Sequence, residues 1–102
     1  MKKGERPSER VKRKLLVENL WYYMLRLLTK KPMYGFEIRE KIDASFGFWI
    51  GNVTAYKVLY DLERDGYVKA ESVSYKKHYS ITAKGRKELG LANTFLKKFM
   101  RQ

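Results

Sequence analysis

The sequence predicts a mainly α (α+β) fold: a winged helix-turn-helix with a β-hairpin wing and an additional C-terminal helix. Apolar residues recur at spacings of three and four in the segments 8–29, 34–44, 53–64 and 83–100, which indicates amphipathic helices. Between the last two of these segments the apolar period changes to two on both sides of a polar, basic turn, which indicates a hairpin. A helix-turn-helix pair followed by a hairpin in this order is typical of a winged helix.

The composition describes one small, strongly basic domain. The chain has 102 residues, of which 44% are hydrophobic and 15% aromatic, enough for a packed core. Its net charge of +12 predicts an anionic partner, which is nucleic acid, an anionic membrane surface or an acidic protein. Cysteine is absent, so disulfides, thiol nucleophiles and thiolate metal sites are excluded.

No stretch of the sequence has the pattern of a secretory signal or of a membrane span. The apolar run Leu20–Leu25 is too short to cross a bilayer, and Glu18, Asn19 and Arg26 interrupt the longer stretch around it. We therefore expect a cytoplasmic, nucleoid-associated protein without a membrane partner.

The N-terminal segment, residues 1–7, is predicted to be a flexible basic arm. Lysines and arginines crowd the first fourteen residues, a pattern typical of a solvated face and also of an arm that touches phosphates. Ser8 is a candidate N-cap for a first helix that reaches about Thr29. Trp21 and Tyr22 widen the apolar stripe of this helix, so a second subunit is expected to cover part of it.

A second helix is expected from about Tyr34 to Ala44. The first helix ends before Pro32, because the residue that precedes a proline is disfavoured in the helical region. Gly35, near the start of the second helix, permits another backbone to approach closely. The apolar run Phe48–Ile50 predicts a short strand before the next helix.

The third helix has a marker at each end, with Asn52 as the predicted N-cap and Gly66 just beyond the last turn. Its two faces differ in chemistry: one is apolar and is expected to enter the core, whereas the other carries aromatic rings and positive charge. The apolar face contains Ala55, Val58, Leu59 and Leu62, and the outward face contains Val53, Tyr56, Lys57, Tyr60 and Arg64. Such an outward face is typical of a recognition helix, whose early residues reach bases or phosphates.

The same helix has a purely structural interpretation. Lys57 can pair with Asp61 at i,i+4, and Tyr56 and Tyr60 can be half-buried packing residues. The helix alone supports both interpretations equally.

The hairpin and the last helix complete the predicted domain. Residues 67–73 and 78–81 are predicted strands, joined by the basic turn Ser74–Lys77. Thr82 is a candidate N-cap for a helix over residues 83–100, which has more apolar surface than one small domain readily covers.

Four short motifs in the sequence are distinctive. They are Tyr34-Gly35-Phe36-Glu37-Ile38; Thr54-Ala55-Tyr56 followed by Leu59; Leu62-Glu63 with Asp65-Gly66-Tyr67-Val68; and Lys76-Lys77-His78-Tyr79-Ser80-Ile81-Thr82-Ala83-Lys84-Gly85. Each is a weak signal alone, but together they resemble, in order and separation, the motifs of PadR-like transcriptional regulators, named after phenolic acid decarboxylase regulators. The resemblance covers roughly residues 22–90.

The resemblance implies a homodimer that binds palindromic operator DNA, usually as a repressor. The dimer is joined mainly by the first and last helices, which agrees with the surplus apolar surface on both. The implied organisation is a basic arm at 1–7, a winged-helix DNA-binding domain at 8–82 and a C-terminal dimerisation helix at 83–102. Some relatives release DNA when a small aromatic effector binds near the dimer interface. No effector site is carried over, because Trp21 and Tyr22 are better explained as interface packing.

The predicted double-stranded DNA contacts lie on the third helix, at the start of the second helix and on the wing. They are Tyr34, Gly35, Asn52, Thr54, Tyr56, Lys57, Tyr60, Lys76, Lys77 and His78. The predicted dimer interface contains Leu20, Trp21, Leu89, Ala92, Phe95, Leu96 and Phe99. His78 has a second interpretation, as a hydrogen-bonded strand residue without a pH-sensing role.

Other classes of function are less well supported by the sequence. It contains no Ser/His/Asp order, glycine-rich phosphate loop or metal-ligand cluster, so we expect no enzyme, cofactor or metal. Two alternatives stay open: a nonspecific, chromatin-type DNA-binding protein and a winged-helix module that binds another protein. The charge of +12 favours nucleic acid over the protein-binding module, but it does not separate specific from nonspecific DNA binding.

Overall fold

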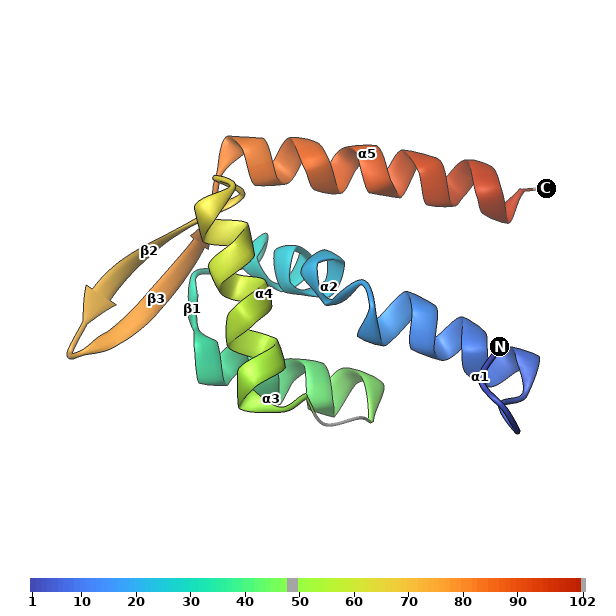
Figure 1. Ribbon diagram of the computed structural model, residues 1–102. Helices are drawn as coiled ribbons and strands as arrows, with labels where there is room; N and C mark the ends of the chain where they lie inside the picture. The colour runs from blue at the N-terminus through green and yellow to red at the C-terminus, as the bar shows by residue number, and fades with distance from the viewer. Residues whose placement is uncertain (48–49, 102) are drawn as a thin grey trace.

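The computed structural model describes residues 1–47 and 50–101 and has the predicted winged-helix architecture (Figure 1). Its elements in chain order are α1 (Pro7–Lys12), the π-helix η1 (Arg13–Val17), α2 (Leu20–Leu28), β1 (Met33–Tyr34), α3 (Gly35–Phe46), α4 (Asn52–Arg64), β2 (Val68–Val73), β3 (Lys76–Ile81) and α5 (Ala83–Met100). The strands form one antiparallel sheet in the order β1-β3-β2. Helix α2 packs against α3, α4 and α5, so it is the centre of the fold. The hairpin projects at the end of the molecule opposite both termini (Figure 1).

The core forms where the apolar stripe of α2 meets α3 and α4. Met24 and Leu25 of α2, Ile38 and Ile42 of α3, and Leu59 of α4 are fully buried. Ala55 and Leu62, on the same face of α4, are buried too, and Val58 is half-buried. The predicted core face of α4 is therefore confirmed. No helix among the described residues combines the length and apolar character that crossing a membrane requires.

The prediction of one continuous first helix is wrong. The chain forms α1, one π-helical segment and α2, and Asn19, the N-cap of α2, leaves the helical region with φ −128° and ψ 38°. Ser8 is not the N-cap either: Arg6 holds that position and Pro7 follows it, where a proline suits the first helical turn. The break separates a basic, exposed helix from the buried α2.

The N-terminal segment folds back onto this basic helix. Arg13 donates from Nε and Nη2 to the Glu5 carboxylate at 2.9 and 3.2 Å, and from Nη1 to Glu18 at 2.8 Å. These contacts tie residue 5 to η1. The mobility of residues 1–7 stays a prediction.

The caps of α4 differ from the prediction at one end only. Gly51 is the N-cap, in an extended conformation, and Asn52 is the first helical residue. The prediction that Asn52 caps the helix is therefore wrong, and no side chain caps this end. At the other end Gly66 has φ 81°, which confirms the predicted left-handed residue just beyond the helix.

The short strand of the helix-turn-helix precedes α3. Strand β1 pairs with β3 through Met33 with Tyr79 and Tyr34 with His78. Of the predicted strand Phe48–Ile50, residues 48 and 49 lie outside the described residues, and Ile50 is buried but belongs to no strand.

The hairpin turn is shorter and less basic than predicted. Only Ser74 and Tyr75 form it, with φ 50° and 67°, and Val73 pairs directly with Lys76. Two left-handed residues match the right-handed twist of the flanking strands. Lys76 and Lys77 are therefore strand residues, and the prediction that they form the tip is wrong.

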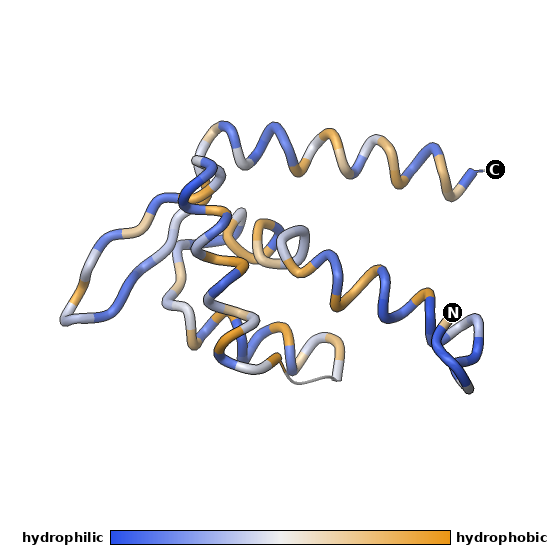
Figure 2. Tube along the Cα trace, in the orientation of Figure 1, coloured by the Kyte–Doolittle hydropathy of each residue, from blue (hydrophilic) through white to orange (hydrophobic). Residues whose placement is uncertain are grey.

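The helix α5 begins at a tight junction. The Thr82 hydroxyl accepts from the Gly85 amide at 3.1 Å and donates to the Gly66 carbonyl at 2.7 Å, so Thr82 is confirmed as the N-cap. Beyond its contact with α2, α5 continues toward the termini, and hydrophobic residues recur along it to the end (Figure 2).

Two glycines of α5 provide a matched test of this junction. A Cβ at Gly85 would lie 2.2 Å from the Tyr67 carbonyl oxygen, whereas a Cβ at Gly90 meets nothing within 4 Å. We expect Gly85→Ala to lower the free energy of unfolding by about 1–3 kcal/mol, because backbone must move. Gly90→Ala should raise it by about 0.5–1 kcal/mol through helix propensity. Urea denaturation of both variants checks these expectations. Changes of the same sign in the two free energies of unfolding would contradict the tight packing of Gly85 against the Tyr67 carbonyl.

The contact between Glu5 and Arg13 predicts a pH dependence. The hydrogen bond from Arg13 lowers the pKa of Glu5 from 4.5 to about 2. Because the pKa falls on folding, this contact stabilises the fold above about pH 4.5, and the stabilisation is lost as the pH falls through about 2. A carbon NMR titration of the carboxyl groups should give this low pKa.

Two variants locate the cause of that shift. Arg13→Gln should return the pKa of Glu5 toward its ordinary value. Lys14→Gln is the control, because Lys14 contacts Glu18 at 3.0 Å and its hydrogen bond is the main cause that lowers the Glu18 pKa. If Lys14→Gln also raised the pKa of Glu5, general charge and not the Arg13 contact would be responsible.

Candidate nucleic-acid interface

The outward face of α4 is exposed as predicted. Val53 and Tyr60 are 85% and 60% exposed, and Tyr56 is 43% exposed. Asn52, Thr54 and Lys57 are exposed as well. The first turn contains no acid, so its free amides and the helix dipole favour an anion at this end.

Asp61 of α4 and Asp65, which follows the helix, are paired with cations of α4. Lys57 Nζ lies 3.1 Å from Asp61, and Arg64 lies 3.2 Å from Asp61 and 3.0 Å from Asp65. The structural interpretation of Lys57 is therefore correct for the free protein. Since the lysine side chain is 72% exposed, this pair contributes little and leaves Lys57 available to a polyanion.

Gly35 is buried beneath the ring of Tyr56. A Cβ at Gly35 would lie 2.6 Å from Tyr56 Cε1 and 3.0 Å from its hydroxyl oxygen. The prediction that another backbone approaches Gly35 is wrong, because an aromatic ring takes that space. The first turn of α3 also has an anion of its own: Glu37 accepts from the Tyr34 amide at 3.0 Å.

Aromatic rings join the base of the wing to α3. The rings of Tyr34 and Phe36 stack with centroids 5.7 Å apart, and Lys76 Nζ lies 5.0 Å from the Phe36 centroid. His78 is half-buried with its ring centroid 4.7 Å from that of Tyr34, as expected of a structural strand residue. These contacts hold Lys76 beside the start of α3.

Lys77 joins the wing to α4. Its Nζ lies 3.0 Å from Glu63, and this carboxylate raises the pKa of Lys77. Lys77 is thus partly neutralised in the free protein, whereas Lys76 has no carboxylate partner among the ion pairs of the described residues.

A groove of about 500 Å³ separates α4 from the wing. Predicted contacts from four elements line it together: Tyr34 of β1, Gly35 of α3, Tyr56 of α4, and Lys76 and Lys77 of β3. Phe36, Tyr75 and Tyr79 line it too and were not among the predicted residues. Only Tyr75 had a sequence signal, its place in a polar turn; at the tip this ring is fully exposed.

The predicted dimer residues are divided between the core and the surface. Leu20 and Leu89 are only 2% and 7% exposed, because they pack in the core of the chain itself. A second subunit therefore finds little surface on these two, contrary to their assignment as interface residues. Trp21, Ala92 and Leu96 are half-buried, and Phe95 and Phe99 are exposed.

The family model of the transcriptional regulator PadR-like family matches residues 24–91, two thirds of the chain. The chain belongs to the PadR-like family. The resemblance drawn from the four motifs is confirmed. As a member of this family, the protein is a DNA-binding transcriptional regulator and not an enzyme.

Solved structures support the same fold. A PadR-like transcription factor from Bacteroides fragilis has 27% identity and a TM-score of 0.75, over 90% of this chain and 93% of that one. A transcriptional regulator from Clostridium thermocellum has 23% identity and a TM-score of 0.76, over 86% and 89%. F93 from STIV, a winged-helix DNA-binding protein, has 21% identity and a TM-score of 0.70, over 82% and 92%. The chain has no significant match among curated proteins.

The close contact between Gly35 and Tyr56 predicts a specific defect in DNA binding. Gly35→Ala should displace the Tyr56 ring, because the added Cβ overlaps it, and should weaken DNA binding by about tenfold. Gly90→Ala is the control, since a Cβ there meets nothing within 4 Å and Gly90 lies on α5, outside the predicted DNA contacts. DNA titrations of both variants check this.

A double variant tests whether Tyr56 transmits the effect. In a Tyr56→Ala background the overlap is gone, so Gly35→Ala should cause no further loss of affinity. Additive losses would show that Gly35 acts by another route.

Proposed function

We propose that the protein is a homodimeric repressor that binds a palindromic operator with sequence specificity. The single observation that carries this proposal is the exposed, acid-free first half of α4 beside a basic wing. In this arrangement Asn52, Thr54 and Lys57 read base edges in the major groove, and the hydroxyls of Tyr56 and Tyr60 hold phosphates.

The wing and the start of α3 extend the contact along the backbone. Lys76, with no carboxylate partner among the described ion pairs, contacts a phosphate, and Tyr75 at the tip reaches the neighbouring minor groove. Lys77 and His78 contribute less directly, because Glu63 and Tyr34 already engage them. We also withdraw Gly35 as a direct contact and assign it the placement of Tyr56.

The exposed apolar face of α5 supports the dimer. Leu91, Phe95, Phe99 and Met100 are all more than half exposed, and Phe95 and Phe99 stack with centroids 6.2 Å apart. Isolated in water, such a face is unfavourable, and a two-fold partner removes it from solvent. Two α4 helices then enter successive major grooves, about 34 Å apart.

The decisive experiment is a fluorescence anisotropy titration of the full chain. One duplex comes from upstream of its own gene and the other is its shuffled version, at two salt concentrations. A preference of about a thousandfold or more supports the operator-reading regulator. If the protein binds the upstream duplex, the shuffled duplex and a genomic pool of duplexes equally and in a salt-dependent way, the result favours the nonspecific, chromatin-type alternative. If no duplex binds at low salt, the result favours the alternative that the winged helix binds another protein.

Two lysines should separate base reading from phosphate contact. Lys57→Ala should reduce the preference for operator over shuffled DNA, because this side chain lies in the middle of the outward face of α4. Lys76→Ala should weaken binding to every duplex by a similar factor and lower the salt slope by about one. Lys87→Ala, on the exposed side of α5, is the control. Identical behaviour of Lys57→Ala and Lys76→Ala would contradict this division.

The dimer proposal has its own test. Phe95→Glu should convert the protein to a monomer in analytical ultracentrifugation, because two charges would meet in the apolar interface. Lys87→Gln changes the net charge by the same amount, away from the exposed rings, and should leave a dimer. A dimer that survives Phe95→Glu would place the interface elsewhere.

A further inference from the structure

The first turn of α4 carries an aliphatic side chain that the fold leaves in solvent. Val53 is 85% exposed, the highest exposed fraction of any described valine, leucine, isoleucine or methionine. Its neighbours in the chain, Asn52 and Thr54, are exposed as well, and Ala55 is the first residue of this helix to be buried. The protein therefore gains very little packing from the two methyl groups of Val53.

Helix formation does not explain this valine either. Valine is a poorer helix former than alanine, because its branched side chain loses rotamer freedom against the preceding turn. A valine side chain also has no oxygen with which to cap the free amides of a first turn, and no side chain caps this end of α4. Neither the core nor the helix thus accounts for Val53, which leaves a contact outside the chain.

The location of Val53 distinguishes it from the scattered exposed aliphatic residues that are normal on protein surfaces. It lies in the acid-free first turn of α4. Tyr56 and Lys57 follow it by three and four residues, so these exposed side chains are its neighbours on the outward face of the helix. When this turn enters the major groove, as proposed above, Val53 lies among the side chains that meet base edges.

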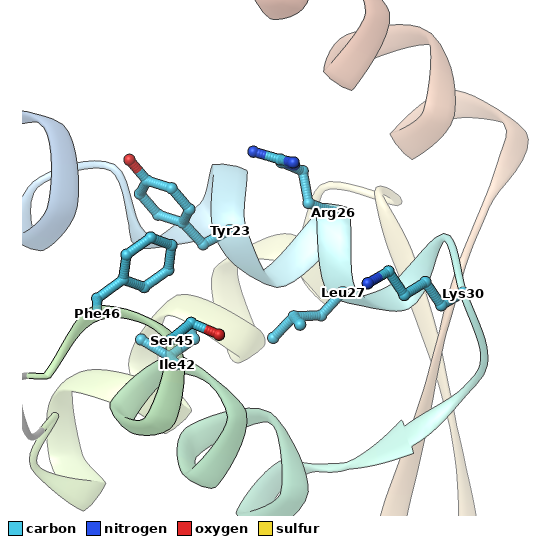
Figure 3. A pocket seen from close by; sticks show the side chains of 7 residues that line it. All are labelled: Tyr23, Arg26, Leu27, Lys30, Ile42, Ser45 and Phe46. Carbon is cyan, nitrogen blue, oxygen red and sulfur yellow. The ribbon is translucent and has the colours of Figure 1, made fainter.

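The start of α4 is held in place by α3. Arg39 of α3 donates from Nε and Nη2 to the Ile50 carbonyl at 3.3 and 3.2 Å, and Ile50 is buried next to the N-cap Gly51. Helix α3 in turn packs on α2, where the rings of Tyr23 and Phe46 have centroids 4.5 Å apart (Figure 3). This support matters for an aliphatic side chain, because apolar contacts act only over about 4 Å.

We propose that Val53 reads a thymine in each half-site of the operator through the C5-methyl group of that base. Among the four bases only thymine presents a methyl group in the major groove, so it is the partner that suits an aliphatic side chain there. The contact removes apolar surface of both groups from water. This inference rests on the proposed function and adds to it a base preference that hydrogen bonds from Asn52, Thr54 and Lys57 do not provide.

Deoxyuridine tests the contact, because uracil keeps the hydrogen-bonding groups of thymine and lacks only its methyl group. The operator is the duplex preferred in the titration above, and its symmetry-related thymines are replaced two at a time. For one such replacement, binding of the full chain should weaken about fifteenfold, or about fourfold when one half-site alone is altered. Deoxyuridine in the shuffled duplex should change little. If no replacement in the operator weakens binding by more than about twofold, the proposal is wrong.

A pair of valine variants shows whether the effect belongs to this side chain. Val53→Ala should weaken binding to the unmodified operator and remove the effect of deoxyuridine at the sensitive thymines, because the partner of the methyl group is gone. Val11→Ala is the matched control: it removes the same two methyl groups from a valine of α1 that is 55% exposed, and it should keep the full deoxyuridine effect. A deoxyuridine effect that persists in Val53→Ala would overturn the proposal.

Urea denaturation separates a reading role from a packing role. Val53→Ala should unfold at the same urea concentration as the unaltered protein or at a higher one, because the side chain is exposed and alanine favours the helix. A clear decrease in that concentration would make Val53 a packing residue and would overturn the proposal.

Failure of this inference can be told from failure of the proposed function. If the unaltered protein prefers no duplex over its shuffled version, operator reading fails and the role of Val53 fails with it. If the preference is present but does not depend on a thymine methyl group, only the role of Val53 fails.

Discussion

The junction at Thr82 is the constraint on which the arrangement of the protein depends. Its hydroxyl donates to the Gly66 carbonyl, its amide donates to the Tyr67 carbonyl at 3.1 Å, and it caps α5 through Gly85. Lys84 adds a hydrogen bond to the Asp65 carbonyl at 2.5 Å. The end of α4, both strands of the wing and the start of α5 thus meet within a few residues. The DNA-facing elements and the helix proposed to join two subunits are held in one orientation, because their polar backbone groups satisfy one another.

A second set of contacts orients the wing against α3 and α4. Stacked rings of Tyr34 and Phe36 support Lys76, and Lys77 reaches Glu63 at the far end of α4. Short strand β1 adds a third partner to the hairpin, which would be marginal as two strands alone. The wing is therefore braced along β3, whereas the Tyr75 ring at its tip is fully exposed. A braced wing would lower the ordering cost of the DNA contact that we propose for it.

Apart from the break between η1 and α2, the sequence alone determined the helices and their faces. Burial requires apolar residues at helical spacing, so the core face of α4, with Ala55 and Leu59, could be recognised without coordinates. Local chemistry likewise located Thr82 as a cap and Gly66 as a left-handed residue, since both depend on neighbours in the chain. Exposure of the predicted contacts on α4 followed from the same periodicity, and motif order was enough to indicate the PadR-like family.

Only the tertiary structure decided the remaining features, because each depends on a partner distant in sequence. Strand β1 forms through its pairing with β3. The break before α2 separates the exposed N-terminal helix from α2, whose apolar stripe packs against α3, α4 and α5. The absence of a side chain at Gly35 makes room for the Tyr56 ring of α4 and not for another backbone. Lys77 pairs with Glu63, which is fourteen residues away in the sequence. Leu89 enters the core because α5 turns back over α2, a direction that periodicity does not encode. Helical spacing says which residues share a face, whereas the packing of several elements decides what that face meets.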